Sequence, residues 1–137
     1  MKILISCLLA LCLLSFPATA APPTTYQQAA QLANKEHKLL FVFFYTDICH
    51  WCHQMATTTL VDRDIRGLFS QYFVVYYLNA DKEQRVVTAY RPYMRGYPTY
   101  CFVSFRNLGK PVMIASSAGC KDLNDFVNWY NNDVGQK

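Results

Sequence analysis

Apolar residues recur along this chain at two spacings, which divide it into helical and extended segments. Residues 24–37 carry apolar side chains at every third or fourth position and begin with two threonines that can cap a helix. An uninterrupted apolar run follows from Leu39 to Tyr45, as is typical of a strand that is buried on both faces of a sheet. The pattern therefore predicts a helix that leads into a buried strand.

The middle of the chain repeats this succession. Its helical segments place apolar residues on one face, and its strand is again a continuous apolar run. In chain order we expect a helix over residues 49–60, a helix over 62–73 capped by Asp62, a buried strand over 73–81, and a helix over 82–90 that ends near Pro92.

The last third of the chain contains two successive strands and a final helix. Residues 96–105 and 111–119 have strand character and flank a turn over 106–110, which predicts an antiparallel hairpin. Apolar residues then recur at helical spacing from Leu123 to Tyr130. The expected order is α, β, α, α, β, α, β, β, α, which favours an α/β domain.

Composition fits one globular domain that follows an export signal. The chain has 137 residues, of which 53% are hydrophobic and 16% charged. Its start combines Lys2, an apolar stretch of about 12 residues and the small residues Ala18 to Ala20, which predicts a secretory signal cut after Ala20. A retained anchor is less favoured, because a membrane span needs about 20 apolar residues. We expect a signal peptide over residues 1–20 and one domain over 21–137.

The charge of the chain is too small to indicate a strongly electrostatic partner. The formal net charge is +4, and it falls by one when Lys2 leaves with the signal. Lysines and arginines never follow one another directly. We therefore expect no nucleic-acid partner, and no stable membrane insertion once the signal has been removed.

Two cysteines and two histidines lie together in the sequence Cys-His-Trp-Cys-His, which starts at Cys49 soon after the first predicted strand. A cysteine at the start of a helix lies among free backbone N–H groups, which favour its thiolate. A protonated His50 would lower the pKa of Cys49 further, and the thiolate is the species that attacks a disulfide. Cys52 would then be the resolving thiol. A purely structural disulfide is less favoured, because so short a loop contributes little stability.

Two other kinds of site share these residues. Cys49, Cys52 and His53 match the C-x-x-C-H motif of haem attachment, in which His53 would bind the iron. Two thiolates with His50 or His53 could instead bind copper, as in a metal chaperone. Haem is less favoured, because small cytochromes are usually helical and this chain contains buried aromatic strands. The candidate second ligands of a haem iron are Met94, Met113 and His37.

A second motif, Arg-Gly-Tyr-Pro-Thr from Arg95 to Thr99, stands at the head of a predicted strand. With the C-x-x-C helix and the order of elements from about Tyr26 to Asn132, it resembles the thioredoxin-like superfamily. The resemblance implies a three-layer α/β/α sandwich with a central mixed sheet of about four strands. It also implies thiol-disulfide oxidoreductase activity.

The resemblance implies a role for each residue of the two motifs. Cys49 would be the nucleophile and Cys52 the resolving cysteine, and Pro98 would complete the catalytic set through a cis peptide bond beside the dithiol. In the family this proline also keeps metal away from the cysteines, which counts against haem and copper. The implied substrate-binding residues are Trp51, Gly96, Tyr97 and Thr99, with Ile48 as a further apolar contact, and the implied modulating residues are His50 and His53.

The chain departs from the family pattern at two places. Thioredoxins keep a buried acid in the strand before the motif, whereas this chain has Phe43 there, so Cys52 lacks its usual proton-transfer partner. A histidine or a water molecule could substitute for that acid. Between the cysteines, thioredoxin has Gly-Pro and the oxidising members have a histidine in second place, whereas this chain has His50 and Trp51. The effect of His50 therefore does not transfer from the family.

Two further cysteines fall near the predicted hairpin. If the hairpin turns near Leu108, Cys101 faces roughly Ala115, and Cys120 lies about five residues further, or roughly 15 Å away. Bridged cysteines have Cα atoms within about 7 Å of each other. We therefore predict that Cys101 and Cys120 are not bonded to each other. Cys101 would be a core residue. The resemblance implies that Gly119 lies at the rim of the active site near the cis proline, so Cys120 would be a rim contact or, less favoured, a third redox-active thiol.

The sequence as a whole predicts a periplasmic or secreted thiol-disulfide oxidoreductase that exchanges disulfides through Cys49 and Cys52. Its expected partners are protein thiols and disulfides, together with an upstream redox partner. Dithiol exchange needs no organic cofactor, and we expect no bound metal. The alternatives are a copper-binding chaperone that uses the same cysteines with a histidine, and a c-type haem protein.

Overall fold

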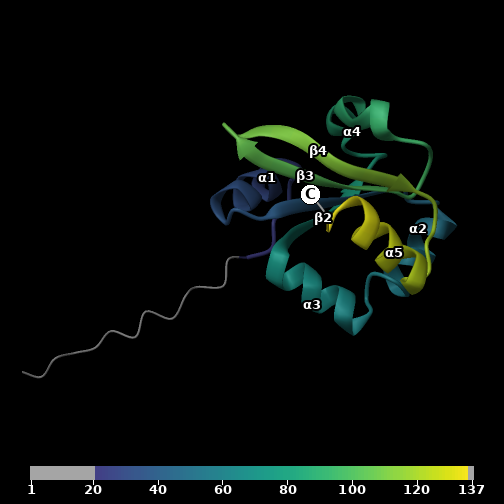
Figure 1. Ribbon diagram of the computed structural model, residues 1–137. Coiled ribbons are helices and arrows are strands. Elements are labelled where there is room, and N and C mark those ends of the chain that lie inside the picture. Colours follow the sequence, from purple (N-terminus) through teal and green to yellow (C-terminus); the bar gives the residue numbers. More distant parts are fainter. Residues whose placement is uncertain (1–20, 136–137) are drawn as a thin grey trace, which may run out of the picture.

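The structure is a computed structural model that describes residues 21–135. The predicted signal peptide, residues 1–20, lies outside the described residues. The elements follow the predicted order (Figure 1). The helices are α1 (Tyr26–Lys35), α2 (His50–Thr57), α3 (Arg63–Tyr72), α4 (Gln84–Tyr90), the short 3-10 helix η1 (Arg91–Tyr93) and α5 (Leu123–Asp133). The strands are β1 (Leu39–Tyr45), β2 (Phe73–Asn79), β3 (Thr99–Asn107) and β4 (Lys110–Ala118).

The described strands form one mixed sheet in the order β2-β1-β3-β4. Strand β1 runs parallel to β2 and antiparallel to β3, and β3 pairs antiparallel with β4. Because β1 is central and paired on both sides, every residue between its two end residues is buried. The continuous apolar run therefore corresponds to the central strand, and the mixed four-strand α/β sheet is confirmed.

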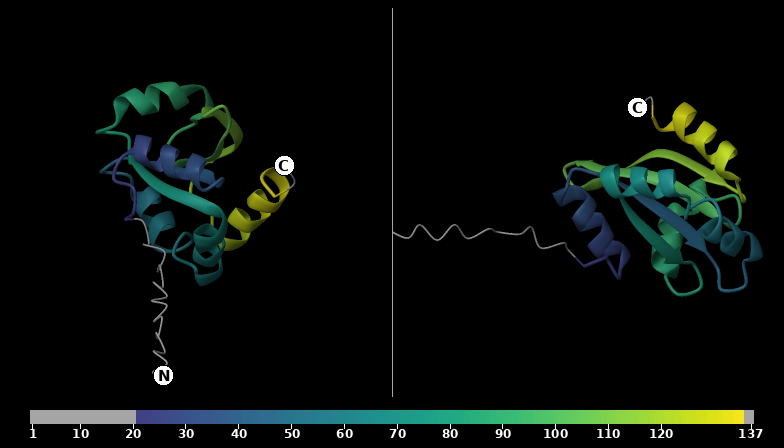
Figure 2. Two further views of the ribbon diagram at one scale, coloured as in Figure 1. Left: turned by 90° about the vertical axis from the view of Figure 1, so that its left-hand side faces the viewer. Right: turned by 90° about the horizontal axis from the view of Figure 1, so that it is seen from below.

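Alternate residues of β1 face two separate cores on opposite sides of the sheet. Leu40, Val42 and Phe44 belong to a core that includes residues of α1 and α4. Phe41 and Phe43 belong to a second core, which includes residues of α2, α3 and α5. Figure 2 shows these two groups of helices on either side of the strands. Helix α2, which follows directly after Cys49 and contains Cys52, thus rests on the second core.

Side chains cap the helices where the sequence indicated. The Asp62 carboxylate accepts hydrogen bonds from the first backbone N–H groups of α3, as expected. Of the two threonines before α1, Thr25 is the cap, and its hydroxyl accepts from the backbone N–H of Gln28 at 3.2 Å. Asp122 caps α5 in the same way, accepting from Asp125 at 2.9 Å. These contacts satisfy backbone donors that a helix start leaves free.

The structure corrects several expected bounds and one expected pairing. Strand β2 ends at Asn79, two residues before the expected end, and β3 spans Thr99–Asn107 rather than 96–105, so the turn before β4 is shorter than expected. Helix α2 ends at Thr57, three residues before the expected end, and α4 begins two residues later than expected, at Gln84. The expectation that Cys101 faces Ala115 is wrong by one residue, since Cys101 pairs with Ser116. The cause is the position of the turn: Asn107 pairs with Lys110, so the hairpin is centred between Leu108 and Gly109 rather than on Leu108, and the two opposite irregularities in the β3–β4 register cancel before Cys101.

Candidate active site

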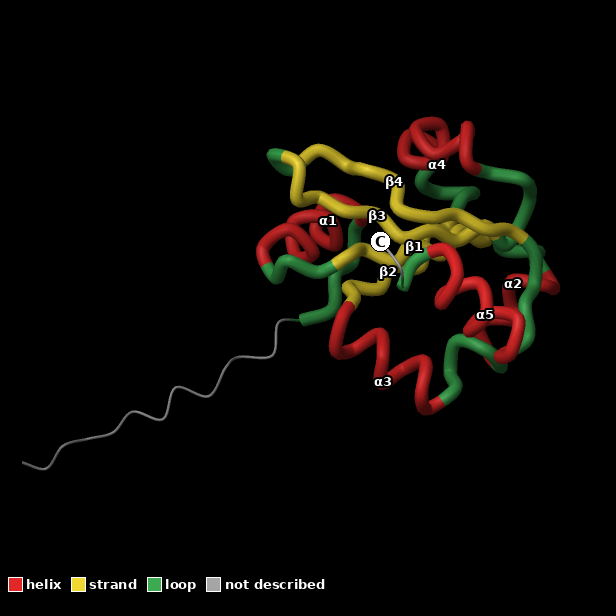
Figure 3. Tube along the Cα trace, viewed as in Figure 1, coloured by secondary structure: helices red, strands yellow, loops and turns green. Residues whose placement is uncertain are grey.

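The two cysteines lie at the junction between β1 and α2. The chain leaves β1 at Tyr45, and Cys49 then forms the N-cap of α2 in an extended conformation. Its sulfur accepts a hydrogen bond from the backbone N–H of Cys52 at 3.1 Å. Figure 3 shows α2 and the loop after β4 together at one end of the sheet, opposite the β3–β4 turn. The local order of strand, loop and helix therefore places Cys49 where backbone N–H groups surround its sulfur.

The described structure is the oxidised form of this dithiol. Cys49 and Cys52 form a disulfide, with their Cα atoms 5.2 Å apart. Cys49 is half-buried, whereas Cys52 is 3% exposed and packs in the second core. The N–H group at the helix start stabilises negative charge on the Cys49 sulfur, and burial among apolar residues gives the Cys52 sulfur no such stabilisation. The arrangement can therefore support attack by Cys49 and resolution by Cys52.

A cleft of about 340 Å³ lies on one side of the disulfide. It lies between α2 and strands β1 and β2, so its walls combine apolar rings with a few polar groups. Its lining residues are Phe43, Tyr45, Thr46, Asp47, Cys49, Cys52, His53, Ala56 and Tyr77. The cleft therefore gives both cysteines a common, partly polar environment.

Sequence reasoning identified the cysteines and His53 but missed Tyr77 and most of the other cleft walls. Tyr77 lies on β2 and pairs in register with Phe43 of β1, and their rings meet edge-on at 5.5 Å. Burial raises the pKa of Tyr77, which keeps its hydroxyl protonated. The relative register of the two parallel strands, which the sequence pattern does not define, was the missing information.

Polar contacts tie the loop before the cysteines to the loop after β2. The side-chain amide of Asn79 donates to the Asp47 carboxylate at 2.7 Å, and the Asp47 backbone N–H donates to the Asp81 carboxylate at 2.8 Å. The Asp81 backbone N–H donates in turn to the Asn79 side-chain oxygen. This network fixes Asp47 in the cleft wall, two residues before Cys49.

The second sequence motif forms the loop that enters β3. The Tyr97–Pro98 peptide bond is cis, and Gly96 has a positive φ of 127°, which favours glycine. The Pro98 carbonyl accepts a hydrogen bond from the backbone N–H of Gly119 at 2.8 Å. Because Thr99 pairs with Phe44 near the end of β1, the loop lies at the same end of the sheet as the cysteines. The cis bond and the approach of Gly119 were both expected.

Three large apolar side chains project into solvent from the loops and the helix around this end of the sheet. Ile48 is 94% exposed, Trp51 57% and Tyr97 37%. By contrast, Pro98 and Thr99 are buried, and the Thr99 hydroxyl donates to the Gly96 carbonyl at 2.6 Å. The buried Pro98 and Thr99 hold the loop in place, and the three exposed side chains offer an apolar surface. Their roles in substrate binding stay predictions.

The two histidines of the motif differ in their surroundings. The ring of His50 contacts Trp51 edge-on, with centroids 5.3 Å apart, and His50 is not among the residues that line the cleft. His53 does line the cleft, with both cysteines. The sequence grouped the two histidines as modulating residues, and the structure separates them into a surface contact and a cleft wall.

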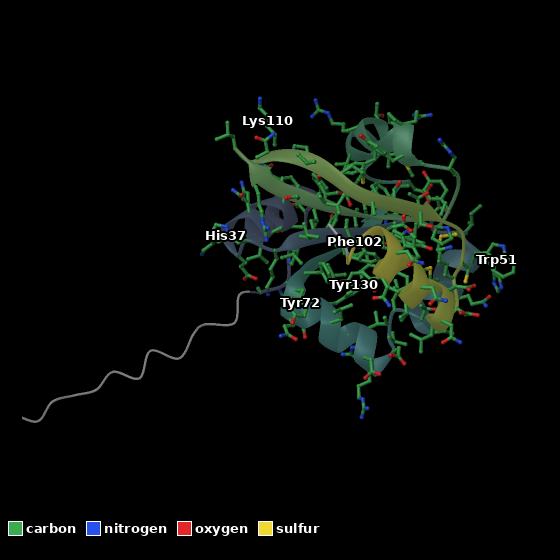
Figure 4. All side chains as sticks on the ribbon, viewed as in Figure 1. His37, Trp51, Tyr72, Phe102, Lys110 and Tyr130 are labelled. Atoms are coloured by element: carbon green, nitrogen blue, oxygen red, sulfur yellow. A yellow bond between two sulfur atoms is a disulfide. The ribbon has the colours of Figure 1, made fainter. Side chains whose placement is uncertain are left out.

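The candidate ligands of the alternative metal and haem sites can each be located in the fold. Within residues 21–135, no group of three or more His, Cys, Asp or Glu side chains is placed to hold a metal ion. Met94 and Met113, two candidate haem ligands, pack against the core on the far face of the sheet from Cys52. His37 and Trp51 lie at opposite ends of the molecule in Figure 4. The fold therefore brings none of these three candidates to His53.

Cys101 and Cys120, the other cysteines of the described part of the chain, are both free, so they are not bonded to each other, as predicted. Cys101 is buried in the first core, and burial raises the pKa of its thiol to about 12. Cys120 is half-buried, and it lines a shallow groove that also contains Trp51. Burial and the neighbouring Asp122 carboxylate raise the pKa of Cys120. Both thiols are therefore kept protonated more strongly than a free cysteine.

No helix within the described part of the chain is long and apolar enough to cross a bilayer.

Comparisons with known proteins agree with this geometry. The family model of the thioredoxin-like domain matches residues 26–130. A thioredoxin from Thermus thermophilus has a similar structure, with a TM-score of 0.69 and 26% identity over 77% of this chain and 81% of that one. The structure titled DsbH oxidoreductase shares the fold, with a TM-score of 0.61 and 18% identity over 90% and 92% of the two chains.

A match to a curated protein covers a shorter segment. Human spermatogenesis-associated protein 20 is 36% identical over 59 residues, which are 43% of this chain. The match spans only 7% of the length of that protein.

Proposed function

The chain belongs to the thioredoxin-like domain family, and from this premise we propose that it is an exported thiol-disulfide oxidoreductase that exchanges disulfides with protein substrates through Cys49. The observation that carries the proposal is the unequal environment of the two bonded sulfurs. Cys49 is half-buried at a helix N-cap and accepts a backbone N–H, whereas Cys52 is buried in the core. An attacking thiol must reach its substrate, so this difference supports Cys49 as the nucleophile.

The proposed reaction proceeds by two thiol-disulfide exchanges. In the reduced protein, the Cys49 thiolate attacks one sulfur of a substrate disulfide, and the other substrate sulfur leaves and takes up a proton. Cys52 then attacks the Cys49 sulfur, which releases the second substrate thiol and forms the Cys49–Cys52 disulfide. Two electrons pass to the substrate, and the reverse sequence oxidises a substrate dithiol. An upstream thiol-disulfide protein restores the starting state.

The exposed apolar residues support a protein substrate. Ile48, Trp51 and Tyr97 present apolar surface that is not buried within this chain. In thioredoxin-like proteins the backbone before the cis proline pairs with an extended substrate segment, and here Gly96 and Tyr97 occupy that position and are exposed. We propose that an unfolded or extended segment with a cysteine docks there.

The export part of the proposal depends on residues 1–20. Their sequence has the basic start, the apolar stretch and the small residues of a secretory signal. A periplasmic or secreted location is oxidising, and a dithiol that exchanges disulfides with other proteins has substrates there. Fractionation of cells that express the full chain would test this part, with the processed protein expected outside the cytoplasm.

Trapping of the mixed disulfide tests the activity. The Cys52→Ala variant, once reduced, should form a covalent adduct with a disulfide substrate such as insulin, because no resolving thiol can release it. The Cys49→Ala variant is the matched control and should form no such adduct. Non-reducing electrophoresis and peptide mass spectrometry would locate the bond. The proposal would be contradicted if Cys52→Ala formed no adduct at Cys49, or if Cys49→Ala formed one through Cys52 or Cys120.

A further inference from the structure

The resolving thiol lies in a setting that offers little help in losing its proton. Cys52 is 3% exposed and packs with apolar residues of the second core. Burial of this kind disfavours a thiolate, yet Cys52 must lose a proton before it attacks the mixed disulfide. Phe43 occupies the place where an acid would assist, and its side chain has no titratable group. Another residue must therefore supply proton transfer, or the step is slow.

We propose that His53 is the proton acceptor for Cys52 during resolution, and the proton donor in the reverse step. The inference rests on the proposed function and adds a residue to its second step. His53 lines the same cleft as both cysteines. It lies four residues after Cys49, and its backbone N–H donates to the Cys49 carbonyl at 3.1 Å. Side chains at this spacing are neighbours on a helix surface, about 5–6 Å apart at Cβ.

The other titratable groups of the cleft are less suited to this step. They are Asp47 in the loop after β1, Tyr45 on β1 and Tyr77 on β2, with Arg66 of α3 acting on Tyr77. The Tyr77 hydroxyl stays protonated, so it cannot accept a proton near neutral pH. The Asp47 carboxylate is engaged by the Asn79 amide at 2.7 Å. Among side chains, imidazole is the group that ordinarily both accepts and releases a proton near neutral pH.

In the resolution step one proton moves through His53, and the number of electrons that pass to the substrate does not change. Neutral His53 takes the proton of the Cys52 thiol, and the resulting thiolate attacks the Cys49 sulfur of the mixed disulfide. The substrate sulfur leaves as a thiolate with its bonding electron pair and takes the proton back from the His53 imidazolium. His53 is then neutral again, and the protein holds the Cys49–Cys52 disulfide.

The test isolates resolution from the first attack. The Cys49 thiol is joined to a chromophoric aromatic thiol as a mixed disulfide, and release of that thiol by Cys52 is followed by stopped flow at several pH values. The protein carries Cys120→Ser, so that within residues 21–135 the other free cysteine is the buried Cys101. We expect the release rate to rise with pH through an inflection that depends on residue 53.

Substitution of His53 should remove that inflection. In His53→Gln we expect release at pH 7 to slow about tenfold, less than the usual 10²–10⁴-fold contribution of general acid-base catalysis, because His53 is exposed and water can partly replace it. Added imidazole should restore the rate in His53→Ala, since the cleft of about 340 Å³ can admit it. Gln54→Ala, at the next position of α2, is the control: Gln54 is exposed and does not line the cleft, so this variant should keep the wild-type profile.

Each outcome supports or overturns the inference. An unchanged rate and pH profile in His53→Gln would overturn it, and so would an inflection that disappears only in Asp47→Asn, which would make the carboxylate the acceptor. Loss of rate without rescue by imidazole would also overturn it, because the role would then be structural. These outcomes can be told apart from failure of the proposed function itself, because in that case reduced Cys52→Ala would form no adduct at Cys49.

Discussion

Phe43 lies beside the dithiol in the second core, and its truncation should destabilise the domain strongly. Its side chain is 1% exposed. The ring stacks on Tyr100 with centroids 6.2 Å apart and meets Tyr77 edge-on at 5.5 Å. Strand β1 is hydrogen-bonded to neighbours on both sides, so the backbone around residue 43 cannot move in to fill a cavity. Phe43→Ala therefore leaves a void between the sheet and α2.

The expected loss can be estimated from these contacts. Truncation of a buried phenylalanine to alanine costs about 3–5 kcal/mol, and aromatic pairs of this kind contribute about 0.5–1.5 kcal/mol each within that sum. Because β1 is held on both sides, we expect a loss in the upper half of the range, about 4–5 kcal/mol. Such a loss is a large part of the about 5–15 kcal/mol by which small domains are stable.

Urea unfolding of the oxidised protein, followed by circular dichroism, measures this loss. The midpoint should fall in Phe43→Ala while the slope with urea concentration stays the same. Tyr77→Ala is the matched control, because the same pair of rings is disrupted from a side chain that is 43% exposed. It should lose clearly less, about 1–2 kcal/mol. A loss below about 1.5 kcal/mol for Phe43→Ala, or equal losses in the two variants, would refute the reasoning.

Three further predictions follow from other contacts. In the native protein at pH 8, iodoacetamide should label Cys120 and leave Cys101 unlabelled, because burial raises the pKa of Cys101 to about 12; peptide mass spectrometry would read the outcome. Asp122→Ala should lower stability by about 1 kcal/mol, since it removes the cap of α5, as thermal unfolding would show. Tyr90→Phe removes the 2.6 Å hydrogen bond with Tyr26 and should cost about 1 kcal/mol in urea unfolding.

Local patterns predicted the elements that depend on local physics. The run from Leu39 to Tyr45 identified the central strand with its bounds, because a strand buried on both faces needs apolar residues at every position. The C-x-x-C segment after it predicted a helix start at Cys49, which the structure confirms as the N-cap. Two cysteines three positions apart at a helix start can bond within one turn, and they do.

Features that depend on register or on contacts between loops were not predictable in the same way. The pairing of Phe43 with Tyr77 depends on how two parallel strands are aligned, which apolar runs leave undefined. The contact between Asp47 and Asn79 joins the loop after β1 to the last residue of β2, 32 residues apart in the sequence. The partner of Cys101 differs by one residue from the expectation because the hairpin is centred between Leu108 and Gly109, and the turn sequence does not define that centre to within one residue.

The reduction potential of the Cys49–Cys52 pair tests the central claim most directly. It can be measured by equilibration in glutathione and dithiothreitol buffers, alkylation of the thiols and mass analysis, with Cys120→Ser to prevent side reactions. A redox-active pair of this family should have a potential between about −120 and −270 mV, the first value typical of disulfide donors and the second of reductases. A potential below about −300 mV, as structural disulfides have, would contradict the account.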